Sequence, residues 1–245
     1  MKPQQEILSQ GWATIERSAL DALAWVDAVR HDSHRLDNEA DKLNLSLHRA
    51  RNLASSLKRV AGTPMTVGFF GISQAGKSYL ISALAAGCNG ALEGRYGERP
   101  VDFIKEVNPV GGGKEATGLV TRFTRAKTTA PANYPVPLQL FSEIDLAKIL
   151  ANTWFNDFNH ELLSYQLDEA RIEARLRPFE DRPINPVANN GVSRDDVVAL
   201  WDYLNGSFRK SVEKLEHGYW PRVLQLAPTL TPTERAESFS LPGGQ

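Results

Sequence analysis

One loop motif constrains this chain most, because it sets a strand, a turn and a helix in a fixed order. Residues 71–78, GISQAGKS, complete the pattern G-x-x-x-x-G-K-S. Residues 65–70 ahead of the motif are apolar and rich in strand formers, and residues 79–86 after it are typical of a helix. A strand before the loop and a helix after it are the context in which this motif binds phosphate.

Each residue type in the motif has a chemical reason to be there. Glycines let backbone N–H groups turn inward around a phosphate, and a helix N-terminus favours negative charge. Lys77 can supply a positive charge to the β- and γ-phosphates, and Ser78 a hydroxyl ligand to Mg²⁺. The alternative is a glycine turn with a surface lysine. The residues expected to bind the cofactor are Gly71, Ser73, Gln74, Ala75, Gly76, Lys77 and Ser78.

A second glycine-rich segment, GGGKEATGLVTRFT at residues 111–124, is a candidate switch loop that closes over the γ-phosphate. Thr117 and Thr121 are its candidate Mg²⁺ ligands, and Lys114 or Arg122 could add charge. The alternative is a flexible glycine loop that leads into an ordinary strand. Residues 119–124 and 136–142 are each predicted to form a strand.

Other signatures of catalysis are missing from the sequence. It contains no D-x-x-G to sense a γ-phosphate and no N/T-K-x-D to read guanine. The five histidines have no metal-ligand spacing and are interpreted as surface or capping residues, and the aromatic residues after residue 150 as helix-packing groups. A single cysteine, Cys88, excludes a disulfide framework.

Residues 1–61 carry an apolar register with steps of four and three, typical of a helical bundle or coiled coil. Either a helical hairpin or one long helix packed on a neighbour is expected, and in the hairpin the polar residues 30–38 form a turn, with Asp32 or Ser33 as the cap of the second helix. The alternative is that these helices only cover a hydrophobic face. The register consists of Leu8, Trp12, Ile15, Ala19, Ala22, Val26 and Val29, then Leu36, Ala40, Leu43, Leu47, Ala50, Ala54 and Leu57.

Residues 142–245 have a helical pattern. Ser142 is a predicted cap, and Ser193 with Asp196 opens a helix that Gly206 is expected to close. Residues 231–234, TPTE, are a strong helix start close to the end of the chain. We therefore expect the sequence to be the N-terminal part of a longer protein.

These patterns predict an α/β fold: a partial P-loop NTPase core, similar to a G domain, with an N-terminal helical bundle or hairpin and a helical insertion. The expected parts are residues 1–61, 62–141 and 142–245. A net charge of −1 over 245 residues indicates no nucleic-acid partner. Without a signal peptide or an apolar run long enough to span a membrane, the bacterial cytoplasm is the expected location.

Four segments resemble SrfC-type virulence factors of enteric bacteria, and the likeness runs from about residue 8 to residue 239. The resemblance implies a virulence-associated protein that can be delivered into a host cell, with a host or bacterial protein partner. The segments are GFFGISQAGKSYLISALAA (68–86), NPVGGGKEATGLVTRFT (108–124), LAKILANTWFNDFNHE (146–161) and GYWPRVLQLAPTLTPTERAE (218–237).

A more distant resemblance is to dynamin-like GTPases, in which QAGKS is the phosphate loop and GLVTR the first switch. It implies that GTP, or else ATP, binds with Mg²⁺ held by Ser78 and Thr121. Dynamin-like enzymes place Gln before Ser ahead of Ala-Gly-Lys, whereas this chain has Ser73 before Gln74. Hydrolysis is therefore expected only in a full-length protein. The resemblance also implies that the protein can self-associate through the G domain or the helical arm. The alternative function is a helical scaffold that binds protein, with a vestigial nucleotide site.

Overall fold

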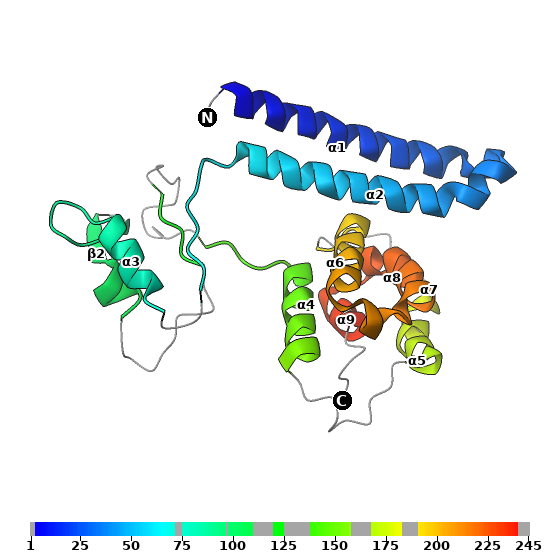
Figure 1. The fold of residues 1–245 in the computed structure, drawn as a ribbon. Helices are drawn as coiled ribbons and strands as arrows, with labels where there is room; N and C mark the ends of the chain where they lie inside the picture. The colour runs from blue at the N-terminus through cyan, green and yellow to red at the C-terminus, as the bar shows by residue number, and fades with distance from the viewer. Residues whose placement is uncertain are drawn as a thin grey trace. The chain divides into compact units, whose positions relative to one another are not determined.

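The structure is a computed structural model, and it describes residues 3–71, 75–96, 98–109, 120–124, 138–157, 168–182 and 191–239. It divides into two compact units (Figure 1). One unit, called here the helical unit, consists of residues 1–64 and 141–245. The other, the loop unit, consists of residues 65–140.

The predicted α/β P-loop core is wrong. Within the described residues the chain is mostly helical, and its strands are β1 (Glu93–Tyr96) and β2 (Arg99–Asp102). They form an antiparallel pair in which Gly94 lies opposite Val101. Neither strand was predicted, and two antiparallel strands do not make the parallel sheet that a P-loop NTPase core requires.

The segments predicted as strands do not pair. The described parts of the three segments, residues 65–70, 120–124 and 138–142, are all outside strands. In the first of them, Met65 and Phe70 are each 95% exposed. High strand propensity reflects packing on a neighbouring strand, so without a ladder partner it does not produce a strand.

The N-terminal residues form a helical hairpin, the first of the two predicted alternatives. It consists of α1 (Pro3–Val29), the short turn η1 (Arg30–Asp32) and α2 (His34–Gly62), which run side by side (Figure 1). Ser33 caps α2 by accepting a hydrogen bond from the Leu36 backbone N–H. Across the turn, Arg30 Nε donates to Asp37 Oδ1 at 2.8 Å.

The rest of the helical unit is built from short helices. Ser142 and Ser193 each form the predicted cap, as capping boxes with Asp145 and Asp196. The helix does not end at Gly206 as expected: its backbone leaves helical geometry two residues later, in a kink at Phe208, and α6 then continues to Val212. The elements are α4 (Glu143–Asn152), η3 (Thr153–Asp157), α5 (Glu169–Glu180), α6 (Arg194–Val212), α7 (Leu215–Gly218), α8 (Trp220–Leu226), η5 (Ala227–Thr229) and α9 (Pro232–Phe239).

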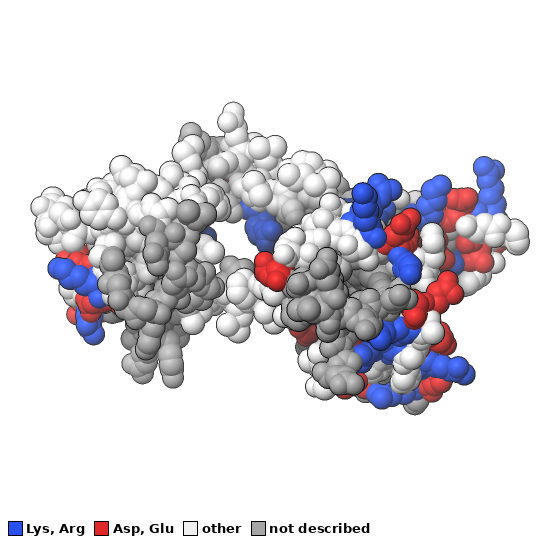
Figure 2. Space-filling model, turned by 60° about the horizontal axis from the view of Figure 1, so that its bottom comes forward, with Lys and Arg blue, Asp and Glu red and all other residues white. Residues whose placement is uncertain are grey.

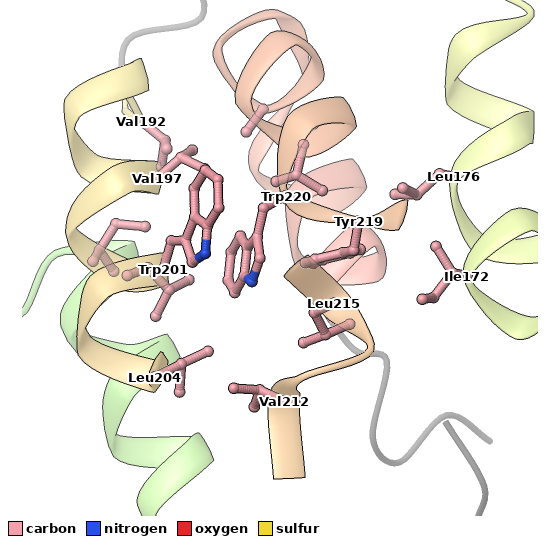
Figure 3. Close-up of a cluster of buried hydrophobic side chains, with 14 residues drawn as sticks. Ile172, Leu176, Val192, Val197, Trp201, Leu204, Val212, Leu215, Tyr219 and Trp220 are labelled. Atoms are coloured by element: carbon pink, nitrogen blue, oxygen red, sulfur yellow. The ribbon is translucent and has the colours of Figure 1, made fainter. Parts of the chain in front are cut away.

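Aromatic residues form the centre of this unit, as the sequence predicts. The Trp201 and Trp220 rings stack with centroids 5.9 Å apart, and Tyr219 packs edge-on against Trp220 (Figure 3). Tyr219 is fully buried, and its hydroxyl donates to the Ser238 carbonyl at 2.9 Å. Burial raises the pKa of Tyr219, so the phenol stays protonated.

The less exposed of two carboxylates through which α6 holds the hairpin is Asp195, 13% exposed against 41% for Asp202. His48 Nδ1 lies 2.7 Å from Asp195 Oδ1, and Arg51 pairs with the other carboxylate oxygen. The Asn52 side chain donates to the Asp195 backbone carbonyl at 2.8 Å. His48 is only 6% exposed, so its interpretation as a surface or capping residue is wrong; it is a buried contact between α2 and α6.

A buried arginine joins the two ends of the second half of the chain. Arg235 of α9 is inaccessible to solvent and donates two hydrogen bonds of 2.6 Å to Glu143 at the start of α4. These hydrogen bonds lower the pKa of the Glu143 carboxyl below its usual value. A third guanidinium nitrogen donates to the Leu230 carbonyl, so each side of the buried charge has a partner.

We predict that Asp195→Ala lowers the free energy of unfolding by about 2–4 kcal/mol, because it leaves His48 and Arg51 without their acceptor. Asp202→Ala is the matched control on the same helix, where Arg49 pairs with a carboxylate that is 41% exposed. Its expected cost is below about 1 kcal/mol. Urea unfolding followed by circular dichroism measures both, and equal costs would contradict a central role for Asp195.

The pairing of Glu143 with Arg235 also predicts a pH dependence. A carboxylate whose pKa is lower in the folded protein stabilises it above the unfolded pKa, about 4.3, and loses this effect as pH falls. Glu143→Gln should therefore destabilise the protein at pH 7 by about 2–4 kcal/mol. The difference in the free energy of unfolding between Glu143→Gln and wild type should become smaller below about pH 4.3. Urea unfolding at pH 7 and pH 3.5 tests this, and a constant gap would refute it.

Candidate phosphate-binding loop

The loop ends in a glycine that the backbone geometry requires. Gly76 is the N-cap of α3 (Lys77–Leu84) and has φ 81° and ψ 11°, in the left-handed region. A Cβ built at Gly76 would meet nothing within 4 Å. The need for glycine is therefore conformational and not steric, as expected where a tight loop turns into a helix.

Lys77 closes the loop on itself. It occupies the first position of α3, and its Nζ donates to the Gly71 backbone carbonyl at 2.9 Å. The first glycine of the motif and its lysine are thus in direct contact although six positions separate them. Ala75 lies within the described part of this loop and is exposed, whereas Ser73 and Gln74 lie outside the described residues.

The start of α3 differs from the starts of the longer helices. Side chains cap α2, α4, α5 and α6, where Ser33, Ser142, Asp168 and Ser193 accept hydrogen bonds from first-turn N–H groups. The α3 helix begins at a glycine and has no side-chain cap. The first-turn N–H groups of α3 therefore receive no acceptor from a capping side chain, and at such a helix start an anion is a natural acceptor.

Ser78 has a partner that sequence reasoning missed. The Asn108 side-chain amide donates to Ser78 Oγ at 2.6 Å. A hydroxyl oxygen has two lone pairs, so the one that Asn108 does not use remains for a cation or a water molecule. The sequence indicates only a turn at this point, because Asn108 precedes Pro109 and the glycine run, and it does not indicate the contact with Ser78.

The predicted switch segment is only partly described. Thr117 lies outside the described residues. Thr121 is described and exposed, and no hydrogen bond joins it to Ser78. Nearby, the Phe123 ring packs edge-on against Phe103, with centroids 4.8 Å apart. Phe103 begins η2 (Phe103–Val107), which packs against α3, so residues 120–124 are anchored to the element that leads to Asn108.

Other kinds of site receive less support from the described residues. No group of three or more His, Cys, Asp or Glu residues within them is placed to hold a metal ion. No described helix is long and apolar enough to cross a membrane. Acidic and basic side chains alternate on the helical unit (Figure 2), where Arg222, for example, pairs with Glu173 at 2.8 Å and with Glu180.

Comparison with known proteins gives one match. A family model described as "Putative bacterial virulence factor" matches residues 22–245, which is most of the chain. No curated protein and no solved structure matches.

Proposed function

The chain belongs to the family of "Putative bacterial virulence factor" proteins, and within it we propose that residues 71–78 bind the phosphates of a nucleotide together with Mg²⁺. The observation that carries the proposal is the hydrogen bond from Lys77 to the Gly71 carbonyl. It holds the lysine ammonium at the first residue of the motif, and the helix that follows starts without a side-chain cap. A phosphate-binding loop needs both a fixed positive charge and backbone N–H groups that can donate to the phosphate.

This proposal does not require the α/β core that the structure contradicts. Binding a phosphate depends on the loop and the first turn of α3, whose contacts are local in sequence. The lysine ammonium has three N–H donors, and the Gly71 carbonyl uses one of them. We propose that phosphate oxygens are further acceptors for this ammonium.

Ser78 is the residue that fits Mg²⁺. Magnesium keeps several waters and takes few protein oxygens, so one hydroxyl beside the phosphates is a sufficient protein contribution. Asn108 fixes the position of that hydroxyl, and the anchoring of residues 120–124 on η2 makes Thr121 the candidate second ligand. When bound, the ion would neutralise phosphate charge.

GTP is the nucleotide favoured by the resemblance to dynamin-like GTPases, and ATP is the alternative. The sequence lacks an N/T-K-x-D motif, so base recognition is expected to be weak. Hydrolysis needs a group that positions water and charge at the γ-phosphate. The sequence has no D-x-x-G, and the order of Ser73 and Gln74 is reversed relative to dynamin-like enzymes. We therefore propose binding without rapid turnover for residues 1–245.

Lys77→Ala should weaken binding of GTP·Mg²⁺ by about 10- to 150-fold, because a hydrogen bond to a charged group contributes about 1.5–3 kcal/mol. The matched control is Lys105→Ala in the same unit, where the ammonium is 80% exposed and lies 3.5 Å from Asp102. This control should leave affinity within about twofold, since η2 lies outside the loop. Isothermal titration with GTP, GDP, ATP and ADP measures all cases. An unchanged affinity of a folded Lys77→Ala variant for GTP·Mg²⁺ would contradict the proposal.

Phosphate release by residues 1–245 should stay near background. In enzymes that have it, a charged group that stabilises the γ-phosphate raises the hydrolysis rate by a factor of about 10³–10⁵, and we propose that this chain lacks such a group. A coupled phosphate-release assay at several protein concentrations measures this, with Lys77→Ala as the control for contaminating activity. Steady turnover that disappears in Lys77→Ala would show that the chain holds catalytic groups of its own.

A further inference from the structure

The contact between α1 and α2 uses only part of the apolar register in the sequence. The residues of α1 that α2 covers repeat with steps of three and four and include Trp12, Glu16, Ala19, Leu23 and Val26. In coiled-coil notation these are a and d positions. Trp12, Ala19 and Val26 are the d positions, and they also belong to the apolar register that the sequence predicts. The other members of that register lie one residue before each a position, and these are g positions.

The g positions of α1 are apolar and at least partly exposed. They are Leu8, Ile15, Ala22 and Val29, and Leu8 and Ile15 are 56% and 46% exposed. In a hairpin that needs no further partner, g positions usually carry Glu or Lys, because they border the seam and face water. The a positions are more polar than the g positions here, since Glu16 pairs with Lys58 of α2 at 2.8 Å.

The g positions of α2 repeat this pattern. They are Leu36, Leu43, Ala50 and Leu57, so both helices have the same apolar stripe. In an antiparallel pair of right-handed helices, the g positions of both lie on the same edge of their common seam. The opposite edge of α2 is the one that holds His48 against Asp195 of α6. The apolar edge, called here the g edge, therefore faces away from α6.

The g edge is large enough to be an interface. Next to it, the outer c positions hold Trp25, Leu53 and Val60, which are 58%, 60% and 67% exposed. With Leu8, Ile15 and Leu43, these side chains expose on the order of 700 Å², close to the roughly 800 Å² that each partner buries in a standard interface. Glu39, a charged c residue, lies near the turn, where it pairs with Lys42 at 3.8 Å.

We propose that two copies of this chain pair through their g edges, so that the two hairpins form a four-helix bundle. A partner for the g edge must present a three-four apolar repeat about 40 Å long, without charges along its middle. The g edge of a second copy has this length and pattern. A two-fold axis through the interface buries the same surface on both copies and leaves no open edge. This association does not involve residues 71–78, so it stands or falls independently of nucleotide binding.

Sedimentation equilibrium of residues 1–245 over a range from about 1 to 200 µM tests the proposal. Wild type is expected to be a dimer in the upper part of this range. Ile15→Glu should raise the dimer dissociation constant at least tenfold, since the two-fold axis places two buried carboxylates in one interface. The matched control is Leu20→Glu on the other edge of α1, where the side chain is 45% exposed against 46% for Ile15.

Leu20→Glu should leave the dimer unchanged. If Ile15→Glu does not fold, as judged by circular dichroism, Leu53→Glu is used in its place, because Leu53 is 60% exposed and contributes little to the monomer. A wild type that stays monomeric throughout the concentration range overturns the proposal. So does a dimer that survives whichever of Ile15→Glu and Leu53→Glu is used, or one that Leu20→Glu weakens equally.

Discussion

The carboxylate of Asp195 decides how the helical unit is put together. It lies in the first turn of α6, where a negative charge is favourable, and it accepts from His48 and Arg51 of α2. A carboxylate with little exposure to solvent is tolerated only when it has hydrogen-bonding partners, so α2 must present His48 and Arg51 at the same level along α6. The Asn52 side chain fixes the same height through the backbone. The orientation of the whole hairpin on the helical unit follows from this junction.

That junction also determines what remains uncovered. With His48 and Asn52 directed at α6, the seam with α1 falls on polar a residues such as Glu16 and Lys58. The apolar g positions of each helix are then left beside the seam. The hairpin contact thus buries apolar residues such as Val26 together with the ion pair of Glu16 and Lys58, and it leaves apolar residues such as Ile15 exposed beside it, where a self-sufficient coiled coil carries charged residues.

The candidate site is local, and this explains why it persists in a fold that differs from the predicted one. Gly76 and Lys77 obtain their geometry from the helix start and from one contact with Gly71, all within a few residues. The strand expected before the loop needs long-range pairing, which the described residues do not supply, and Phe70 remains exposed. Asn108 was missed for the same reason, because its approach to Ser78 depends on the path of the chain between them.

The sequence by itself determined the features that depend on neighbours along the chain. These are the helix starts at Ser142 and Ser193, the turn at Ser33, the helical periods and the glycine that the loop requires. Tertiary structure alone decided which edge of each helix is buried, whether strand-forming segments find partners, and the burial of His48. These outcomes depend on contacts between residues far apart in sequence, whose free energies periodicity and propensity do not contain.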